Sequence, residues 1–188
     1  MPAQPNGVPS AGEADMPTTE RIAAFVRLVG LVAACVLLPA QIVLSAGSVI
    51  ARRFLHFQLT PVQELEWHLF FALVFLTLGS AYLADRHVRI DIVRDRMSER
   101  SRALIEIGGF FLALLPFSLI VLYLGTGQAW DTFMLGERSR APLGLTHRWI
   151  IRSMIPVGAL LLLLAGLVVT FRNFKLLSRQ GAADQPSS

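Results

Sequence analysis

The side chains that could do chemistry in this sequence are few and scattered. The sequence contains no HExxH motif, no GxSxG motif and no phosphate-binding glycine loop, so the usual residues of metalloproteases, serine hydrolases and P-loop enzymes are missing. Its one cysteine, Cys35, lies in an apolar run, which excludes a disulfide or a CxxC metal site within the chain. We therefore expect no catalytic residue, no metal site and no enzymatic activity.

Four histidines allow one cofactor hypothesis. A bis-histidine haem site needs two histidines on facing helices at a similar depth. His68 and His147 could share a depth, whereas His87 falls at the opposite membrane face. Solvated histidines at the membrane surface are the simpler interpretation, so we expect no cofactor. A haem- or quinone-associated membrane anchor of a respiratory enzyme remains the alternative function.

Three charged residues lie close to the ends of apolar runs: Glu66, Glu106 and Arg152. Charged side chains inside a membrane are costly and mark ion pairs, subunit contacts or solute pathways. Near a helix end they can also extend to the membrane surface. Glu66 and Arg152 could pair with each other, or each could contact a neighbouring subunit. The middle thirds of the apolar runs contain no acid or base, which argues against a solute pathway through this chain alone.

The apolar run that begins at Thr60 shows most clearly how these residues are held. Thr60 and Gln63 form a capping box around Pro61, which suits the first position of a helix. Residues 69–84 are almost wholly apolar, and a dense cluster of charge follows them. A helix over 61–84 would be roughly 36 Å long, enough to cross a hydrocarbon core of about 30 Å. The pattern predicts a membrane crossing with a stop on one side.

Small residues and prolines mark where such helices would pack and bend. Gly30 with Ala34, and the small residues from Gly79 onward, offer faces for close helix packing. Pro39 and Pro116 lie within the first and third apolar runs, and a proline kinks a helix because it lacks an N–H.

The whole pattern predicts an all-α membrane protein with four transmembrane helices. A third helix that ends at Gly136 would be roughly 50 Å long, so it would tilt or protrude. The expected helices span about 22–51, 61–84, 99–135 and 147–172, in a transmembrane domain over 21–177 between a disordered tail (1–20) and a polar tail (178–188).

Charge supports the membrane assignment and gives an orientation. Charged residues make up 16% of the chain, below the roughly 25% of soluble domains. Most arginines flank apolar runs, so the basic pI of 10.2 does not indicate a nucleic-acid partner. Eleven Lys and Arg residues fall on the side of the termini and the central loop, against six on the other side. The positive-inside rule therefore places both termini in the cytoplasm.

Two blocks of this sequence resemble the small membrane subunit (DctQ type) of tripartite ATP-independent periplasmic transporters, the TRAP family. The first is Glu66-Trp67 with the stretch FFALVFLTLGSAYLADRHVRIDIV over 70–93. The second comprises GERS over 136–139, LGLT over 143–146 and RWIIRSMIPVGALLLLL over 148–164. The resemblance covers about 22–174. Thr146 stands where the family often has proline, and threonine can cap the following helix.

The resemblance implies a multi-pass protein of the bacterial inner membrane with two protein partners. These would be a large permease subunit (DctM type) and a periplasmic solute-binding protein (DctP type), with membrane lipid around them. The large subunit would carry the transport path, an elevator-like symport driven by an ion gradient, usually sodium. The small subunit would brace it and help to dock the solute-binding protein. The substrate class would be organic acids.

The resemblance also implies which residues make contacts. The His-x-Arg-x-Asp segment after the second helix would fix the connection at the inner face and contact lipid headgroups or the large subunit. The outer loop after the third helix would contact the solute-binding protein. Apart from the resemblance, Trp67 lies in its apolar run where an interfacial aromatic belt is expected. The candidate contact residues are Glu66, Trp67, His87, Arg89, Asp91, Glu137, Ser139, Arg140 and Arg152.

Overall fold

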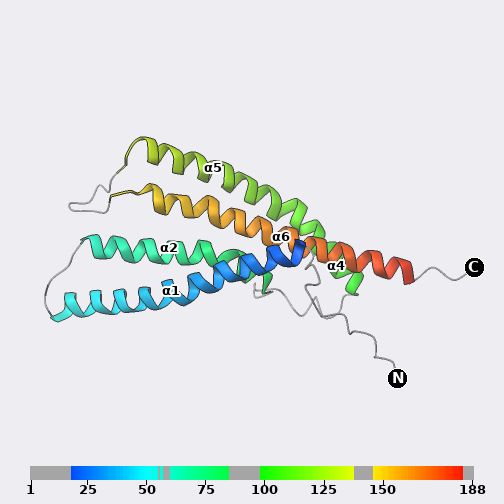
Figure 1. Cartoon of the computed structure of the whole chain (residues 1–188), viewed down its shortest axis with the longest axis horizontal. Helices are drawn as coiled ribbons and strands as arrows, with labels where there is room; N and C mark the ends of the chain where they lie inside the picture. The colour runs from blue at the N-terminus through cyan, green and yellow to red at the C-terminus, as the bar shows by residue number, and fades with distance from the viewer. Residues whose placement is uncertain (1–17, 55, 57–59, 85–97, 138–145, 184–188) are drawn as a thin grey trace, which may run out of the picture.

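Four long helical segments dominate the computed structural model of the chain (Figure 1). The structure describes residues 18–54, 56, 60–84, 98–137 and 146–183. The elements are α1 (Thr18–Phe54), α2 (Thr60–Leu83), α4 (Glu99–Gly109), the π-helical segment η1 (Phe110–Leu114), α5 (Leu115–Met134) and α6 (Trp149–Ala183). α4, η1 and α5 follow one another directly and form one long helix. Four of the described segments are long and apolar enough to cross a membrane, as predicted.

The helices lie side by side in the order α1, α2, α6, α5 (Figure 1). α6 contacts every other helical element, so it is the central helix of the bundle. α1 begins and α6 ends at the same end of the molecule, close to α4; we call this the terminal end. α2 begins and α5 ends at the opposite end, which we call the loop end.

Glycines set the closest approaches between these helices. A Cβ on Gly30 of α1 would overlap with Ser80 Oγ of α2. A Cβ on Gly79 of α2 would fall 2.6 Å from the Leu161 carbonyl oxygen of α6. Such small residues allow helix backbones to pack closely in a membrane. The small-residue faces predicted at Gly30 and Gly79 are therefore contact faces within the bundle.

The long third helix changes its winding just before Pro116. Proline has no N–H, and its ring clashes with the carbonyl four residues earlier. The chain accommodates the proline through η1, where the Leu115 N–H donates to the carbonyl of Phe110, five residues back. Such π-bulges are a recognised cause of bends in helices.

Gly136 ends this helix as expected. It has a φ of 57°, in the left-handed region that glycine tolerates best. The Gly136 N–H donates to the carbonyl of Phe133 (3.2 Å), and the Glu137 N–H donates to that of Thr132 (3.2 Å). This pair of bonds is a Schellman motif, which satisfies the last carbonyls of the helix.

Two helix boundaries differ from the expected ones. α6 continues to Ala183, beyond the expected end near 172 and into the expected polar tail. No proline occurs over 157–183, and Lys and Leu, which both favour helix, occur in the extension. α1 begins at Thr18, within the expected tail of 1–20. Glu20 stabilises its first turn because an acid is favourable at the positive end of a helix.

Candidate functional site

Arg152 connects three parts of the chain at the loop end. It lies in the first turn of α6. Its Nη1 donates to Thr132 Oγ1 of α5 at 2.6 Å, and its Nη2 lies 3.0 Å from Glu137 Oε2. We call Thr132, Glu137 and Arg152 the loop-end clamp. The clamp connects the start of α6 to the last turn of α5. It also connects the start of α6 to Glu137, the residue after Gly136.

Thr132 is the buried centre of this clamp, with 1% of its surface exposed. Its Oγ1 donates to the Gln128 carbonyl at 2.7 Å and accepts from Arg152. Its own carbonyl accepts from the Glu137 N–H in the Schellman motif. Buried polar groups cost stability unless they are paired. The Thr132 side chain therefore binds Arg152 while the Thr132 backbone binds Glu137, and together these contacts position Glu137 beside Arg152.

The acid that pairs with Arg152 is Glu137, so the structure does not form the Glu66–Arg152 pair that the sequence left open. α2 and α5 lie on opposite sides of α6, and Arg152 extends toward α5. Glu66 Oε1 is buried and has no hydrogen-bond partner within the described part of the chain. The neighbouring Trp67 is 68% exposed at the loop end.

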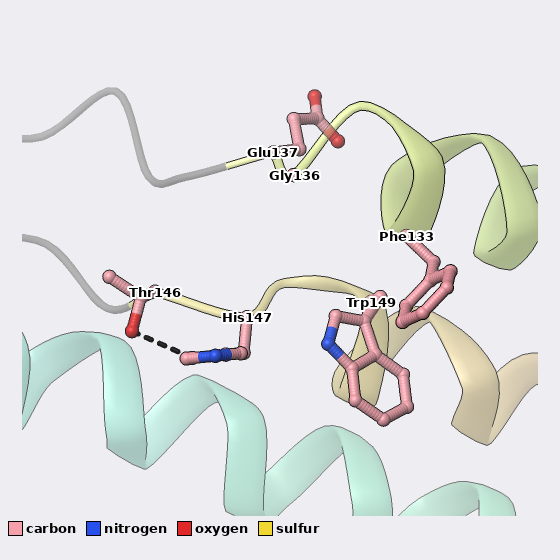
Figure 2. A pocket seen from close by; sticks show the side chains of 6 residues that line it. All are labelled: Phe133, Gly136, Glu137, Thr146, His147 and Trp149. Atoms are coloured by element: carbon pink, nitrogen blue, oxygen red, sulfur yellow. Dashed lines mark hydrogen bonds between the residues drawn. The ribbon is translucent and has the colours of Figure 1, made fainter.

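A pocket of about 280 Å³ opens beside the loop-end clamp (Figure 2). Phe133 and Trp149 meet edge to face with ring centroids 5.5 Å apart and form its aromatic wall. Glu137 comes from the α5 side, and Thr146 and His147 come from the stretch that leads into α6. The volume is slightly below the usual range for small-molecule pockets, about 300–1,000 Å³.

The two histidines of the haem hypothesis make local hydrogen bonds. His68 Nδ1 lies 2.5 Å from the Glu64 carbonyl of its own helix. His147 Nδ1 lies 2.8 Å from Thr146 Oγ1, and its φ of 65° turns the chain into α6. In the part of the chain that the structure describes, no group of three His, Cys, Asp or Glu residues could hold a metal ion.

A second clamp closes the terminal end. Arg172 of α6 binds Glu20 of α1 through both carboxylate oxygens, with N–O distances of 2.8–3.1 Å. Asn173 Nδ2 donates to Glu106 Oε2 of α4 at 2.7 Å. We call these four residues the terminal-end clamp. The sequence singled out Glu106 but missed its partner Asn173. The sequence did contain a signal for this pair: Asn173 lies near the end of the fourth apolar run, and Glu106 lies near the start of the third.

The other predicted contact residues lie outside the described residues. They are His87, Arg89 and Asp91 of the inner segment, and Ser139 and Arg140 of the outer loop. Their roles stay predictions.

Between the two clamps, the described surface is apolar. Large side chains point outward on α1 and along the third helix, with Val43 73% exposed and Leu112 85% exposed. No Asp, Glu, Lys or Arg interrupts residues 28–50 or 107–130. The clamps thus hold the ends of a bundle in which these two stretches of the middle offer no carboxylate, ammonium or guanidinium group to a passing solute.

Comparison with known families supplies the identity that this geometry alone does not. The family model described as "Tripartite ATP-independent periplasmic transporters, DctQ component" matches residues 41–176. The match contains the loop-end clamp and both Glu106 and Asn173, and it begins after Glu20. No curated protein matches the chain.

Proposed function

Because the chain belongs to the DctQ family, the small inner-membrane subunits of TRAP transporters, we propose that it braces the large permease subunit in the bilayer. As a member of this family it is a transport component and not an enzyme. The proposed partners are the large permease subunit and the periplasmic solute-binding protein. The proposed process is ion-gradient-driven uptake of an organic acid.

One observation carries the bracing role: the helices form a row whose apolar faces stay uncovered. α1 packs on α2 and α6, and α5 packs chiefly on α6. Their outer faces carry large exposed side chains such as Leu31, Val43, Phe117 and Tyr123. Exposed apolar surface of this extent is typical of contact with lipid or with another membrane subunit. A row of helices with an apolar middle suits a scaffold better than a transport path.

The loop-end clamp supports the second role, docking of the solute-binding protein. Glu137 and Thr146 flank residues 138–145, and Arg152 holds Glu137 in place. A binding surface is more effective when its supporting residues are preorganised. We therefore assign Arg152 as a positioning residue for the outer loop.

Binding of the purified solute-binding protein to the assembled complex tests this role. Arg152→Gln should weaken binding about tenfold, equal to about 1.4 kcal/mol, while the large subunit still co-purifies. The control Arg172→Gln removes an arginine of the same helix at the opposite end and should leave binding unchanged. If the Arg152→Gln complex bound the solute-binding protein with wild-type affinity, the loop-end clamp would have no role in docking.

Uptake into liposomes tests whether the chain acts as a subunit. The chain alone should give no uptake of an organic acid under a sodium gradient. Addition of the large subunit and the solute-binding protein should give uptake. Transport by the chain alone would instead support a self-sufficient channel or exporter.

A further inference from the structure

An apolar groove lies along α1 in the half of the bundle nearest the terminal end. Its volume is about 410 Å³. Six residues of α1 and one of α2 line it: Leu28, Val29, Val32, Ala33, Val36, Leu37 and Leu76. Leu28, Val32 and Val36 are each more than half exposed, so the bundle itself leaves the groove uncovered.

The length of the groove indicates what fills it. From Leu28 to Leu37 the groove extends roughly 14 Å along α1, at 1.5 Å per residue. This is about half of a hydrocarbon core of roughly 30 Å. An acyl chain of one leaflet extends through about half of that core. The groove therefore fits a lipid tail.

A cation lies on the same face, beyond the end of the groove. Arg21, Phe25 and Leu28 follow the i, i+4, i+7 spacing of one helix face. Arg21 lies roughly 10 Å from Leu28 along the helix, toward the membrane surface. Its neighbour Glu20 is held by Arg172. Arg21 is exposed and makes no ion pair with any residue that the structure describes.

We infer that the groove and Arg21 form a binding site for one anionic phospholipid. One acyl chain lies between α1 and α2, and the Arg21 guanidinium binds the headgroup phosphate. A guanidinium forms strong charge-assisted hydrogen bonds to phosphate oxygens. This site is independent of the docking role, because it lies at the other end of the bundle from Arg152.

Lipid retention by the intact complex tests the site. The complex containing the full chain is purified in mild detergent and mixed with phosphatidylglycerol or phosphatidylcholine, and bound lipid is counted by native mass spectrometry. Wild type should retain phosphatidylglycerol about fivefold better, the factor that one basic residue near an anionic lipid supplies. Arg21→Gln should reduce this to the phosphatidylcholine level.

Two further variants distinguish lipid binding in the groove from a general effect of positive surface charge. Arg27→Gln removes an exposed arginine six residues on, which faces away from the groove at 100° per residue, and should leave retention unchanged. Val32→Trp fills the groove and should reduce retention of both lipids. Arg21→Gln changes an exposed side chain, so it decides the result if Val32→Trp does not assemble.

Three results would overturn the proposal. Equal retention of the two lipids by wild type would show that the site has no preference for an anionic lipid. Equal losses in Arg21→Gln and Arg27→Gln would reduce it to surface charge. A photo-cross-linker at Val32 that captures a protein in native membranes, and no lipid, would show that a partner subunit covers the groove.

Discussion

Thr132 and Arg152 join α5 to α6 at the loop end, where the Arg152 guanidinium donates to the buried Thr132 hydroxyl at 2.6 Å. Arg152 lies in the first turn of an apolar helix, where a charged side chain is costly unless it has a partner. The sequence therefore indicated Arg152 as a contact residue. The partner depended on which helix lies beside α6, which the sequence does not specify. The sequence did not identify Thr132, because its burial and its bond to Arg152 follow from the packing of α5 on α6.

Replacing Thr132 by valine should destabilise the protein by about 1–3 kcal/mol. The change leaves the Arg152 donor without its buried acceptor, and an unpaired group in such a place costs about that much. The measurement is thermal unfolding of the purified protein in detergent.

Thr126→Val is the matched control for Thr132→Val. Thr126 lies on the same helix, and its hydroxyl also bonds to the carbonyl four residues back, Leu122, but it is exposed. Its replacement should change stability by less than about 0.5 kcal/mol. Equal losses in the two variants would refute a special role for the clamp.

The Glu20–Arg172 pair should contribute only about 0.5–1 kcal/mol, despite its two-pronged geometry. Its side chains are 42% and 35% exposed, and solvent screens ion pairs at such sites. A double-mutant cycle with Glu20→Gln and Arg172→Gln measures the coupling. The coupling should fall at high salt; a salt-independent value of several kcal/mol would mean that the pair is effectively buried.

The end of the third helix was predicted from sequence, because a helix cap depends on local residues. Gly136 ends α5 through its own positive φ and two bonds to the preceding turn. The π-segment before Pro116 was not predicted, since several ways of relieving a proline clash are possible in a long helix. The continuation of α6 to Ala183 was missed because the fourth helix was expected to end where its apolar run ends, near 172, whereas the helix continues through the polar residues that follow.

Gly79→Ala should force α2 and α6 apart. The added Cβ would meet backbone atoms of Leu161, with its carbonyl oxygen at 2.6 Å, and backbone cannot rotate away. Overpacking of this kind costs about 1–3 kcal/mol. The loss is measured as a lower Tm of the purified protein.

Gly127→Ala is the control for Gly79→Ala. A Cβ at Gly127 of α5 meets nothing within 4 Å. Alanine should leave Tm unchanged or raise it, because alanine favours helix over glycine by up to about 1 kcal/mol. A fall in Tm with Gly127→Ala as large as with Gly79→Ala would contradict the contact geometry.

At the scale of the whole molecule, the sequence predicted the number of crossings but not their order. α2 and α6 are apolar on nearly all sides, so their sequences mark no buried face. The central place of α6 therefore emerges only from the packing, where Gly158 leaves room for Phe75 and Gly166 leaves room for Phe110.

The orientation predicted from charge can be tested with reporter fusions. Green fluorescent protein fused to either terminus should fluoresce, because both termini are expected in the cytoplasm. Alkaline phosphatase inserted between Gly136 and Thr146 should be active, since that loop is expected in the periplasm. Active phosphatase at the termini would reverse the orientation and place the loop-end clamp on the cytoplasmic side.

The central claim is that this chain works as the small subunit of a larger transporter. Its most direct test is a pull-down of the tagged chain from gently solubilised native membranes, with partners identified by mass spectrometry. The account predicts recovery of a large multi-helix permease, with the solute-binding protein in addition when substrate is present. Recovery of respiratory subunits, or of the chain without a partner, would contradict it.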